Sequence, residues 1–378
     1  MEKVAVAGVG MKRFGFYPDT SVHDLACAAA LAALDDAGLT FADIDAVYVG
    51  HIFMPVMTGV RAIKEIGLTG VPIQRIENAS ATGSACLREA YLAISGGHYD
   101  KVLVVGLDKM TEVMGQTPSA PALEDSILPA AFFAMWATRR MHERGTTREH
   151  LAKIAAKNWN NGALNPMSQR QPTTTVTVEG VLKAGMVSWP LTKMMACPIG
   201  DGAAAAVVTR ESTAKKLANG RPVVRVLASH LGSEKYERGH LFMGPVVGPA
   251  QMSRDAAKDL WEQSGIGPED VDLVQVHDAF VIEELEYYEL LGFCKEGEAE
   301  ACIERGDFEP GGRVPFSTDG GLIARGHPGG PTGLAQIWET VHQLRGTAGK
   351  RQVENARIGL CHMMGGGSVC IAHLLGRE

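Results

Sequence analysis

The feature that most constrains the fold is a unit of helix, glycine, short turn and buried strand that occurs twice. It runs from Ala37 to Val47 (AGLTFADIDAV) and again from Ser264 to Val274 (SGIGPEDVDLV). A second echo, in the same order, pairs Ala81-Thr82-Gly83 with Pro331-Thr332-Gly333, each ahead of an apolar helix. Glycine is the usual helix C-cap, and the apolar run that follows it is typical of a buried strand. The repetition predicts two halves of similar topology.

Short apolar runs alternate with Ala- and Leu-rich stretches along the chain, which predicts an α/β layer architecture with buried strands. Gly8-Val9-Gly10 lacks the third glycine of a dinucleotide-binding fingerprint, so we interpret it as a turn that ends the first strand. The expected helix is Leu25–Ala37, and the expected strands are Val4–Ala7, Ala46–Val49, Val102–Val105, Ala203–Val208, Val223–Ala228, Leu273–Val276 and Ile358–Leu360.

The length of 378 residues suits two packed halves better than one core. The regularly spaced apolar runs that predict strands stop over about residues 111–187. This Met-, Asn- and Gln-rich stretch predicts a loop or cap domain inserted in the first half. Residues 212–221 are a predicted linker between the halves. The expected boundaries are therefore 1–221 for the N-terminal half and 222–378 for the C-terminal half.

Charge and cysteine usage argue against several classes of protein. A net charge of −7 and a pI near 6.0 come without the basic stripe that nucleic-acid binding needs. Seven scattered cysteines without a C-x-x-C pair predict neither a disulfide framework nor a metal site, and they suit a reducing compartment. We expect no signal peptide and no span of the roughly 18 to 20 apolar residues that crosses a bilayer. The expected location is cytoplasmic.

Small residues precede an apolar helix in the segment Asn78–Ala85 (NASATGSA), and this helix is predicted over Cys86–Ile94. Ser80 would lie near the helix N-terminus, where free N–H groups and the macrodipole stabilise developing negative charge. Serine is also a common N-cap for backbone reasons alone. Both interpretations stay open on this local evidence.

Three later segments place histidines at sites typical of chemistry. His277 follows a predicted buried strand, and active sites in open α/β sheets lie at the C-terminal ends of strands. His327 lies in a loop, Gly320–Gly333, whose six glycines and two prolines would fix the imidazole. A third strand ends in Cys361 and His362 ahead of the glycine turn 365–367, whose backbone N–H groups could meet a carbonyl closely.

Together these four blocks resemble the thiolase superfamily, in particular its sterol-carrier-protein-like and archaeal acetoacetyl-CoA thiolase branches. The resemblance rests on Gly-His-Pro within the Gly320–Gly333 loop and on His-Asp-x-Phe at His277–Phe280, and it spans nearly the whole chain. It implies a duplicated five-layer αβαβα fold with an inserted loop domain, in a homodimer or homotetramer. It also implies an acyl-CoA C-acyltransferase, which cleaves or forms 3-ketoacyl-CoA with coenzyme A as substrate or product and with no permanent cofactor.

The resemblance assigns roles to individual residues. Ser80 stands where the family carries its nucleophilic cysteine, and His327 would activate that nucleophile. His277 would complete an oxyanion site, while the backbone N–H groups of Ser80 and Gly366 would form a second one. His362 matches a histidine of archaeal-type thiolases.

A further acid–base cysteine of some branches corresponds here to Met363 or Ala279. Cys361 is a possible acid–base group in its place, although a strand position also suits a buried structural thiol. Cys86 cannot replace Ser80 and is expected in the core, because six residues separate the two, almost two turns of a helix.

A serine nucleophile changes the expected energetics, because its hydroxyl is far less acidic than a thiol and forms a stable oxoester. We therefore expect slow thiolysis through Ser80 and keep two alternatives. One is a retro-aldolase that acts on 3-hydroxyacyl-CoA without a cysteine, although such relatives tend to have tyrosine where this chain has Gly326-His327-Pro328. The other is a non-catalytic CoA-binding subunit that works beside a small zinc-ribbon/OB-fold protein.

Overall fold

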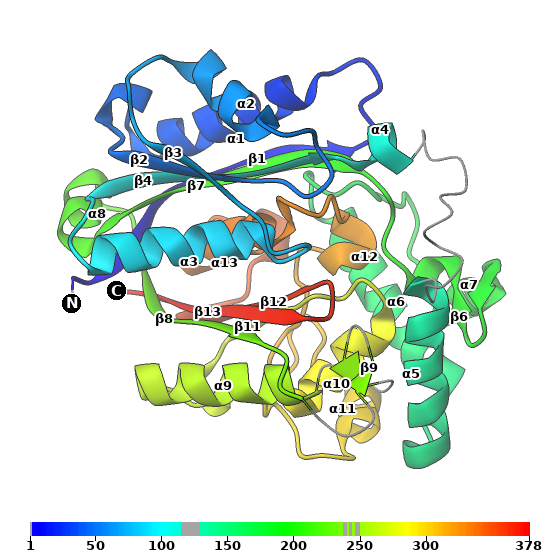
Figure 1. Cartoon of the computed structure of the whole chain (residues 1–378). Coiled ribbons are helices and arrows are strands. Elements are labelled where there is room, and N and C mark those ends of the chain that lie inside the picture. The colour runs from blue at the N-terminus through cyan, green and yellow to red at the C-terminus, as the bar shows by residue number, and fades with distance from the viewer. Residues whose placement is uncertain (1, 115–128, 237–239, 242–243, 246–249) are drawn as a thin grey trace.

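The computed structural model describes residues 2–114, 129–236, 240–241, 244–245 and 250–378 (Figure 1). Nine strands form one hydrogen-bonded ladder in the order β11-β12-β13-β8-β1-β7-β4-β2-β3. Their bounds are β1 Val4–Gly15, β2 Ala46–Gly50, β3 Ile73–Ile76, β4 Lys101–Lys109, β7 Asp201–Arg210, β8 Val224–Ser233, β11 Leu273–Gln275, β12 Ile358–Gly365 and β13 Val369–Arg377.

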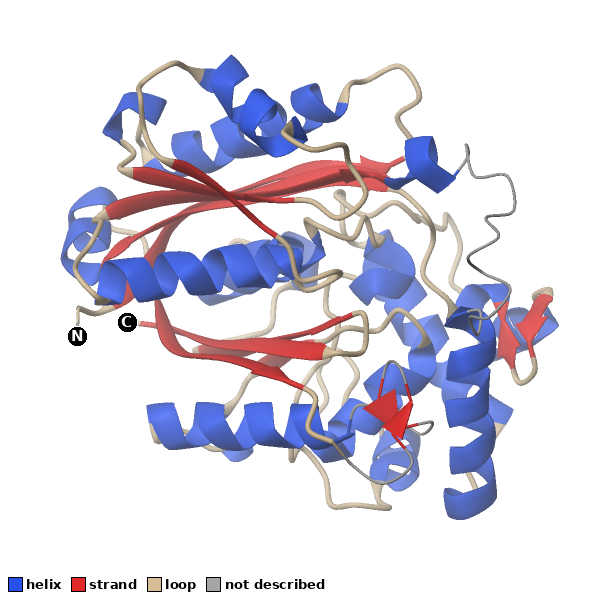
Figure 2. Cartoon of the chain, in the orientation of Figure 1, coloured by secondary structure: helices blue, strands red, loops and turns tan. Residues whose placement is uncertain are grey.

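The ladder folds into two stacked sheets, because β1 pairs with β8 only where Val4–Val6 meets Val224–Val226. Figure 2 shows helices above, between and below the two sheets, which gives five layers. The outer helices of the first half are α1 (Val22–Ala37) and α2 (Thr58–Ile66), and those of the second half are α9 (Ala250–Ser264) and α10 (Val281–Leu290). Helices α3 (Thr82–Ser95) and α13 (Thr332–Arg345) lie between the sheets. The predicted five-layer fold is confirmed.

The two halves repeat one topology. Strands β2-β4-β7-β1 of the first half and β11-β12-β13-β8 of the second lie in the same order. In each set the first pair is parallel and the next two pairs are antiparallel. The echoed Ala-Thr-Gly and Pro-Thr-Gly triplets lie at the corresponding starts of α3 and α13. The exact boundary between the halves stays a prediction.

The segments between the shared strands differ between the halves. In the first half, the segment between β4 and β7 holds α4 (Met110–Met114), α5 (Pro129–Arg144), α6 (Arg148–Ala163), α7 (Val178–Lys183), β5 (Met186–Ser188) and β6 (Leu191–Thr192). The remaining elements are α8 (Glu211–Leu217), β9 (His240–Leu241), β10 (Gly244–Pro245), α11 (Ala299–Arg305) and α12 (Gly321–Arg325).

One local prediction was wrong. Gly8 and Gly10 do not form a turn, because both lie inside β1, where a Cβ atom would come within 2.3 Å of Ala33 O and 2.2 Å of Ala29 O. They are glycines because α1 lies directly on the strand.

The predicted linker 212–221 lies between β7 of the first half and β8 of the second. Most of it forms α8, which Glu211 and Lys215 stabilise with a salt bridge one turn apart.

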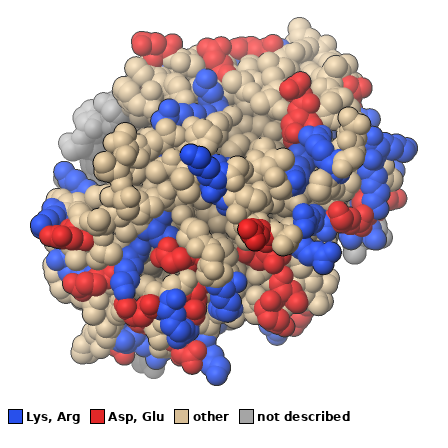
Figure 3. All heavy atoms as spheres, turned by 180° about the vertical axis from the view of Figure 1, so that it is seen from behind, with Lys and Arg blue, Asp and Glu red and all other residues tan. Residues whose placement is uncertain are grey.

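The surface carries both signs of charge. Figure 3 shows Lys and Arg side chains next to Asp and Glu side chains over the face seen from behind. Within the described residues, every helix is too short or too polar to cross a bilayer.

Candidate active site

Ser80 lies in a strained turn directly before α3. Helix α3 begins at Thr82, four residues earlier than predicted, so Ser80 is two residues outside the helix. Ala79 has φ +47°, a left-handed conformation that costs a non-glycine residue roughly 1 to 2 kcal/mol. The Thr82 hydroxyl holds the turn by donating to Ala79 O at 2.6 Å and accepting from Asn78 N at 2.9 Å. This turn presents the Ser80 hydroxyl beside the helix N-terminus.

His327 approaches Ser80 from the other half of the chain. Its Nε2 lies 3.1 Å from Ser80 Oγ, and its Nδ1 lies 2.8 Å from Thr332 Oγ1. The Thr332 hydroxyl donates its own proton to Pro328 O at 2.6 Å, so it can only accept from Nδ1. Nδ1 therefore carries the proton, and the Nε2 lone pair faces the serine. Burial, with His277 and Arg325 nearby, lowers the pKa of His327 well below its ordinary value, which keeps the ring neutral.

Glycines let α3 and α13 meet closely enough for this contact. A Cβ on Gly83 would lie 2.7 Å from Gly330 O and 3.0 Å from Leu334 N. A Cβ on Gly333 would lie 2.2 Å from Ser84 Oγ. Because the loop before each helix carries one reactive group, this approach sets the distance between Ser80 and His327.

Gly83→Ala is expected to destabilise the protein by about 1 to 3 kcal/mol, because the new methyl group meets backbone rather than a movable side chain. The usual gain from replacing a helical glycine by alanine is about 1 kcal/mol, so the expected sign is reversed. Denaturant unfolding measures the change. Gly180→Ala in the exposed α7 is the control, since its Cβ has only Thr177 Oγ1 near it, at 3.3 Å. Equal effects of the two substitutions would contradict the expectation.

His277 lies on the third side of the site, two residues after β11. Its ring is in edge-to-face contact with that of His327, with centroids 5.3 Å apart. Its Nδ1 lies 2.8 Å from Glu283 Oε1, and its buried Nε2 has no partner among the described protein atoms. The structure thus brings Ser80, His327 and His277 together from three separate segments.

The glycine turn between β12 and β13 packs against the Ser80 turn. A Cβ on Gly365 would lie 2.2 Å from Asn78 O, and one on Gly366 would lie 3.5 Å from the Cβ of Ala79. Gly366 has φ +57°, which suits glycine. The turn is therefore close enough for its backbone to line the same space as Ser80.

Cys361 and His362 lie away from Ser80. Cys361 packs in the core beneath α13, 3.1 Å from Thr340 Oγ1, and burial raises the pKa of its thiol to about 12. His362 is on the opposite face of β12, where Nε2 lies 3.0 Å from Ser253 Oγ and burial lowers its pKa to about 3. Met363, not His362, packs against Ala81 at the start of α3. Neither Cys361 nor His362 has a described contact with Ser80, and we assign neither a catalytic part.

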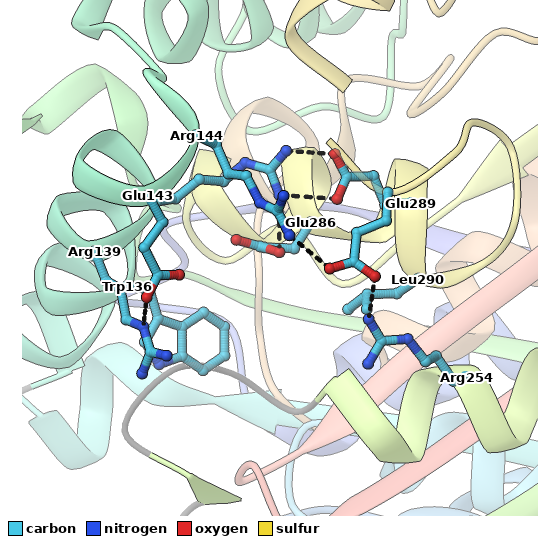
Figure 4. Close-up of a pocket in the computed structure, with 10 residues that line it drawn as sticks. Trp136, Arg139, Glu143, Arg144, Arg254, Glu286, Glu289 and Leu290 are labelled. Atoms are coloured by element: carbon cyan, nitrogen blue, oxygen red, sulfur yellow. Dashed lines mark hydrogen bonds and ion pairs between the residues drawn. The ribbon is translucent and has the colours of Figure 1, made fainter. Parts of the chain in front are cut away.

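A charged cavity of about 240 Å³ lies between α5, α9 and α10, away from Ser80 (Figure 4). Its arginines and glutamates are paired with one another rather than open to a ligand. Arg140, which is 5% exposed, donates to Glu300 at 2.8 Å, to Glu286 at 3.1 Å and to Glu289. These bonds join the cap helix α5 to α10 and to the start of α11. The Arg140 cluster therefore has a structural role, because it holds α5 against α10 and α11.

Arg140→Met is expected to destabilise the protein by about 3 to 5 kcal/mol, because it leaves three largely buried carboxylates without their cation. Arg139→Met is the matched control. Arg139 is one helix position away and pairs with Glu143 at the surface, where a salt bridge contributes about 0 to 1 kcal/mol. Denaturant unfolding compares the two variants. A loss of less than 1 kcal/mol in the free energy of unfolding of Arg140→Met would contradict this structural role.

Sequence reasoning missed three residues that position the site. They are Thr332, which fixes the His327 tautomer, Glu283, which holds His277, and Asp108. The Asp108 carboxylate accepts from Ile52 N at 3.1 Å and from Gly330 N at 2.7 Å, which ties the His327 loop to the first half. Burial raises the pKa of Asp108 to about 6. Within the described ranges, no three His, Cys, Asp or Glu side chains are placed to hold a metal ion.

Comparisons with known proteins identify relatives over the whole chain. A family model described as "Thiolase, N-terminal domain" matches residues 4–212, and one described as "Thiolase C-terminal domain-like" matches residues 238–376. The chain is 37% identical to the acetyl-CoA acetyltransferase of Methanothermobacter thermautotrophicus over all of both chains. It is 36% identical to human sterol carrier protein 2, with 98% of this chain and 71% of that protein covered. A solved structure described as "Ltp2-ChsH2(DUF35) aldolase" matches with a TM-score of 0.87 and 26% identity, covering 100% of this chain and 98% of that one.

Proposed function

Because the chain belongs to the thiolase family, we propose that it is an acyl-CoA C-acyltransferase that cleaves or forms the carbon–carbon bond of a 3-ketoacyl-CoA. The observation that carries this proposal is the 3.1 Å contact between Ser80 Oγ and the unprotonated Nε2 of His327. A hydroxyl paired with a neutral imidazole is the arrangement of an activated nucleophile. The acetyl-CoA acetyltransferase relative, similar along its full length, supports the same reaction class.

In the cleavage direction, Ser80 Oγ bonds to the ketone carbon while its proton moves to His327 Nε2. The carbon–carbon bond then breaks, and its electron pair goes to the carbon next to the thioester, which takes a proton from a second acid–base group as acetyl-CoA leaves. The thiol of coenzyme A next gives its proton to that second group and attacks the acyl carbon, and His327 returns its proton to the departing serine oxygen. Backbone N–H groups of Ser80 and Gly366 are the proposed donors to the carbonyl oxygen.

Two features of the site oppose fast turnover. The serine hydroxyl must lose its proton during attack, and the acyl-serine is an oxoester, so its return to coenzyme A is uphill. We therefore propose that the second half-reaction limits the rate and that the acyl-enzyme accumulates.

A second candidate is retro-aldol cleavage of a 3-hydroxyacyl-CoA. It is supported by the similarity to the aldolase structure and by Met363 and Ala279 at the family's cysteine positions, because aldol chemistry needs no thiol. The Ser80–His327 pair favours the acyltransferase, because retro-aldol cleavage does not use a nucleophilic serine.

We also propose a small partner subunit, because the name of the aldolase structure includes a DUF35 protein. The family resemblance implies a homodimer or homotetramer, with or without a small zinc-ribbon/OB-fold protein, and the mass of the purified native complex tests both expectations. All seven cysteines are free thiols, which supports a cytoplasmic location.

Intact-protein mass spectrometry with a panel of 3-ketoacyl-CoAs tests the proposal, while released coenzyme A and acetyl-CoA are followed. We expect the mass of the chain to rise by one acyl group and that of Ser80→Ala to stay unchanged. An aldehyde or ketone released from a 3-hydroxyacyl-CoA would support the aldolase instead. Binding of acyl-CoA without any product would indicate a non-catalytic subunit.

A further inference from the structure

Glu283 fixes the orientation of His277. One carboxylate oxygen, Oε2, accepts from the backbone N–H of Phe280 at 3.1 Å, which closes the start of α10. The other, Oε1, lies 2.8 Å from His277 Nδ1 and also accepts from the Tyr287 hydroxyl at 3.3 Å. The side chains of His277 and Glu283 are 8% and 2% exposed. A carboxylate held at both oxygens fixes the imidazole at Nδ1, while the ring lies in edge-to-face contact with that of His327.

The same contact determines which nitrogen carries the proton. An ionised carboxylate can only accept, so Nδ1 is the donor in the neutral ring. Nε2 then holds a lone pair, and this buried atom has no partner among the described protein atoms. A neutral ring in this tautomer accepts a proton at Nε2, whereas the oxyanion site implied by the family resemblance requires a donor there.

Four titratable side chains near this pair are neutral. Burial lowers the pKa of His362 to about 3 and holds that of His327 well below its usual value, so both rings are neutral. Burial also raises the pKa of Tyr287 well above its usual value and that of Cys197 to about 12, so neither group is ionised. Among the described residues, His277 is the one basic side chain that pairs with Glu283.

The Glu283–His277 pair is arranged like the carboxylate and histidine of a catalytic triad. In such a triad a buried carboxylate selects the imidazole tautomer and stabilises the imidazolium that forms. We propose that His277 is the base for the substrate carbon and that Glu283 is its positioning residue. This inference rests on the proposed function and identifies the group that replaces the family's acid–base cysteine.

The proposed step is balanced in both directions. In condensation, His277 Nε2 takes a proton from the methyl carbon of acetyl-CoA, and the C–H electron pair forms the enolate of the thioester. Glu283 then lies against an imidazolium, whose positive charge it stabilises. Cleavage starts from the imidazolium: its Nε2–H gives the proton to that carbon as acetyl-CoA leaves, and the neutral ring then takes the thiol proton of the incoming coenzyme A.

Exchange of the methyl protons of acetyl-CoA in deuterated water tests this step separately from acyl transfer. The experiment uses the full chain with Ser80→Ala, in which no acyl-serine can form. We expect this chain to exchange the protons, and we expect Glu283→Gln added to it to slow exchange by about 10²- to 10⁴-fold. The amide can donate to Nδ1, which would place the proton on Nε2. The dissociation constant for acetyl-CoA should stay within about twofold.

Tyr287→Phe is the control, because it removes one hydrogen bond to Glu283 and keeps the carboxylate; a change below about tenfold is expected. Nitrogen-15 spectra of histidine-labelled protein should show the proton of His277 on Nδ1 in the natural chain and on Nε2 in Glu283→Gln. Exchange and tautomer both unchanged in Glu283→Gln would overturn the inference. If the natural chain forms no acyl-enzyme with any 3-ketoacyl-CoA, exchange that depends on Glu283 would still support the inference, while the proposed acyltransferase would be refuted.

Discussion

Ser80→Cys is expected to raise the rate of 3-ketoacyl-CoA thiolysis by at least about 100-fold. A free thiol has a pKa near 8.5, and a helix N-terminus lowers it further, so a thiolate is available near neutral pH. The site already holds the other parts, since His327 Nε2 lies 3.1 Å from the side-chain oxygen at this position. A thioester intermediate also returns its acyl group to coenzyme A with little change in free energy. Steady-state release of acetyl-CoA measures the gain.

Ser95→Cys is the matched control, because it adds the same thiol at the far end of α3, where Ser95 Oγ donates to Leu92 O at 3.2 Å. It should leave the rate unchanged. Equal thiolysis by the natural chain and by Ser80→Cys would show that the reaction does not pass through an acyl group on residue 80. The acyltransferase mechanism would then be wrong, whatever the product.

His327→Asn is expected to lower kcat by about 10²- to 10⁴-fold with little change in KM, the usual contribution of a positioned base. The asparagine side chain cannot take the Ser80 proton at this position. Because the pKa of His327 is well below its ordinary value of 6.5, the imidazole stays neutral through pH 6.5 and becomes protonated only at lower pH. Protonation of His327 should therefore lower kcat/KM only below pH 6.5. Stopped-time assays of acylation between pH 4.5 and 8 measure both effects.

His342→Asn controls for loss of a histidine from the same region. His342 lies in α13, and its Nδ1 contacts Thr347 rather than the site, so activity should be unchanged. Thr332→Val keeps His327 but removes the acceptor of its Nδ1 proton, and an intermediate loss of about tenfold is expected. A full rate in His327→Asn would mean that another group takes the serine proton.

The architecture could be predicted from the sequence because its signals are local. Buried strands and helix caps repeat in the same order, which predicts two α/β halves of similar topology; the resemblance to the thiolase superfamily adds the five layers, and the structure confirms them. Gly8 and Gly10 were misinterpreted because their cause is remote: the helix that excludes a Cβ begins twelve residues after Gly10. The start of α3 was placed too late for a similar reason. Residues 82–85 are small because α13 crosses them, and small residues carry no apolar signal.

The site was partly predictable. Ser80, His327 and His277 follow from motifs, whereas Glu283 and Thr332 act on those groups from positions that no motif marked. The sequence did contain a clue to His362. Alternate residues of a strand face opposite sides, so Met363 and His362 could not both face α3. A spacing of three between Phe280 and Glu283 is also half of a capping box, which could have identified the carboxylate that closes α10.

The corresponding threonines at the two helix starts give the site an internal symmetry. Thr82 donates to Ala79 O and Thr332 donates to Pro328 O, so each hydroxyl fastens the loop before its own helix. One fastened loop presents the proposed nucleophile, and the other presents the proposed base. The internal repeat therefore supplies two equivalent supports, one for each reactive group of the site.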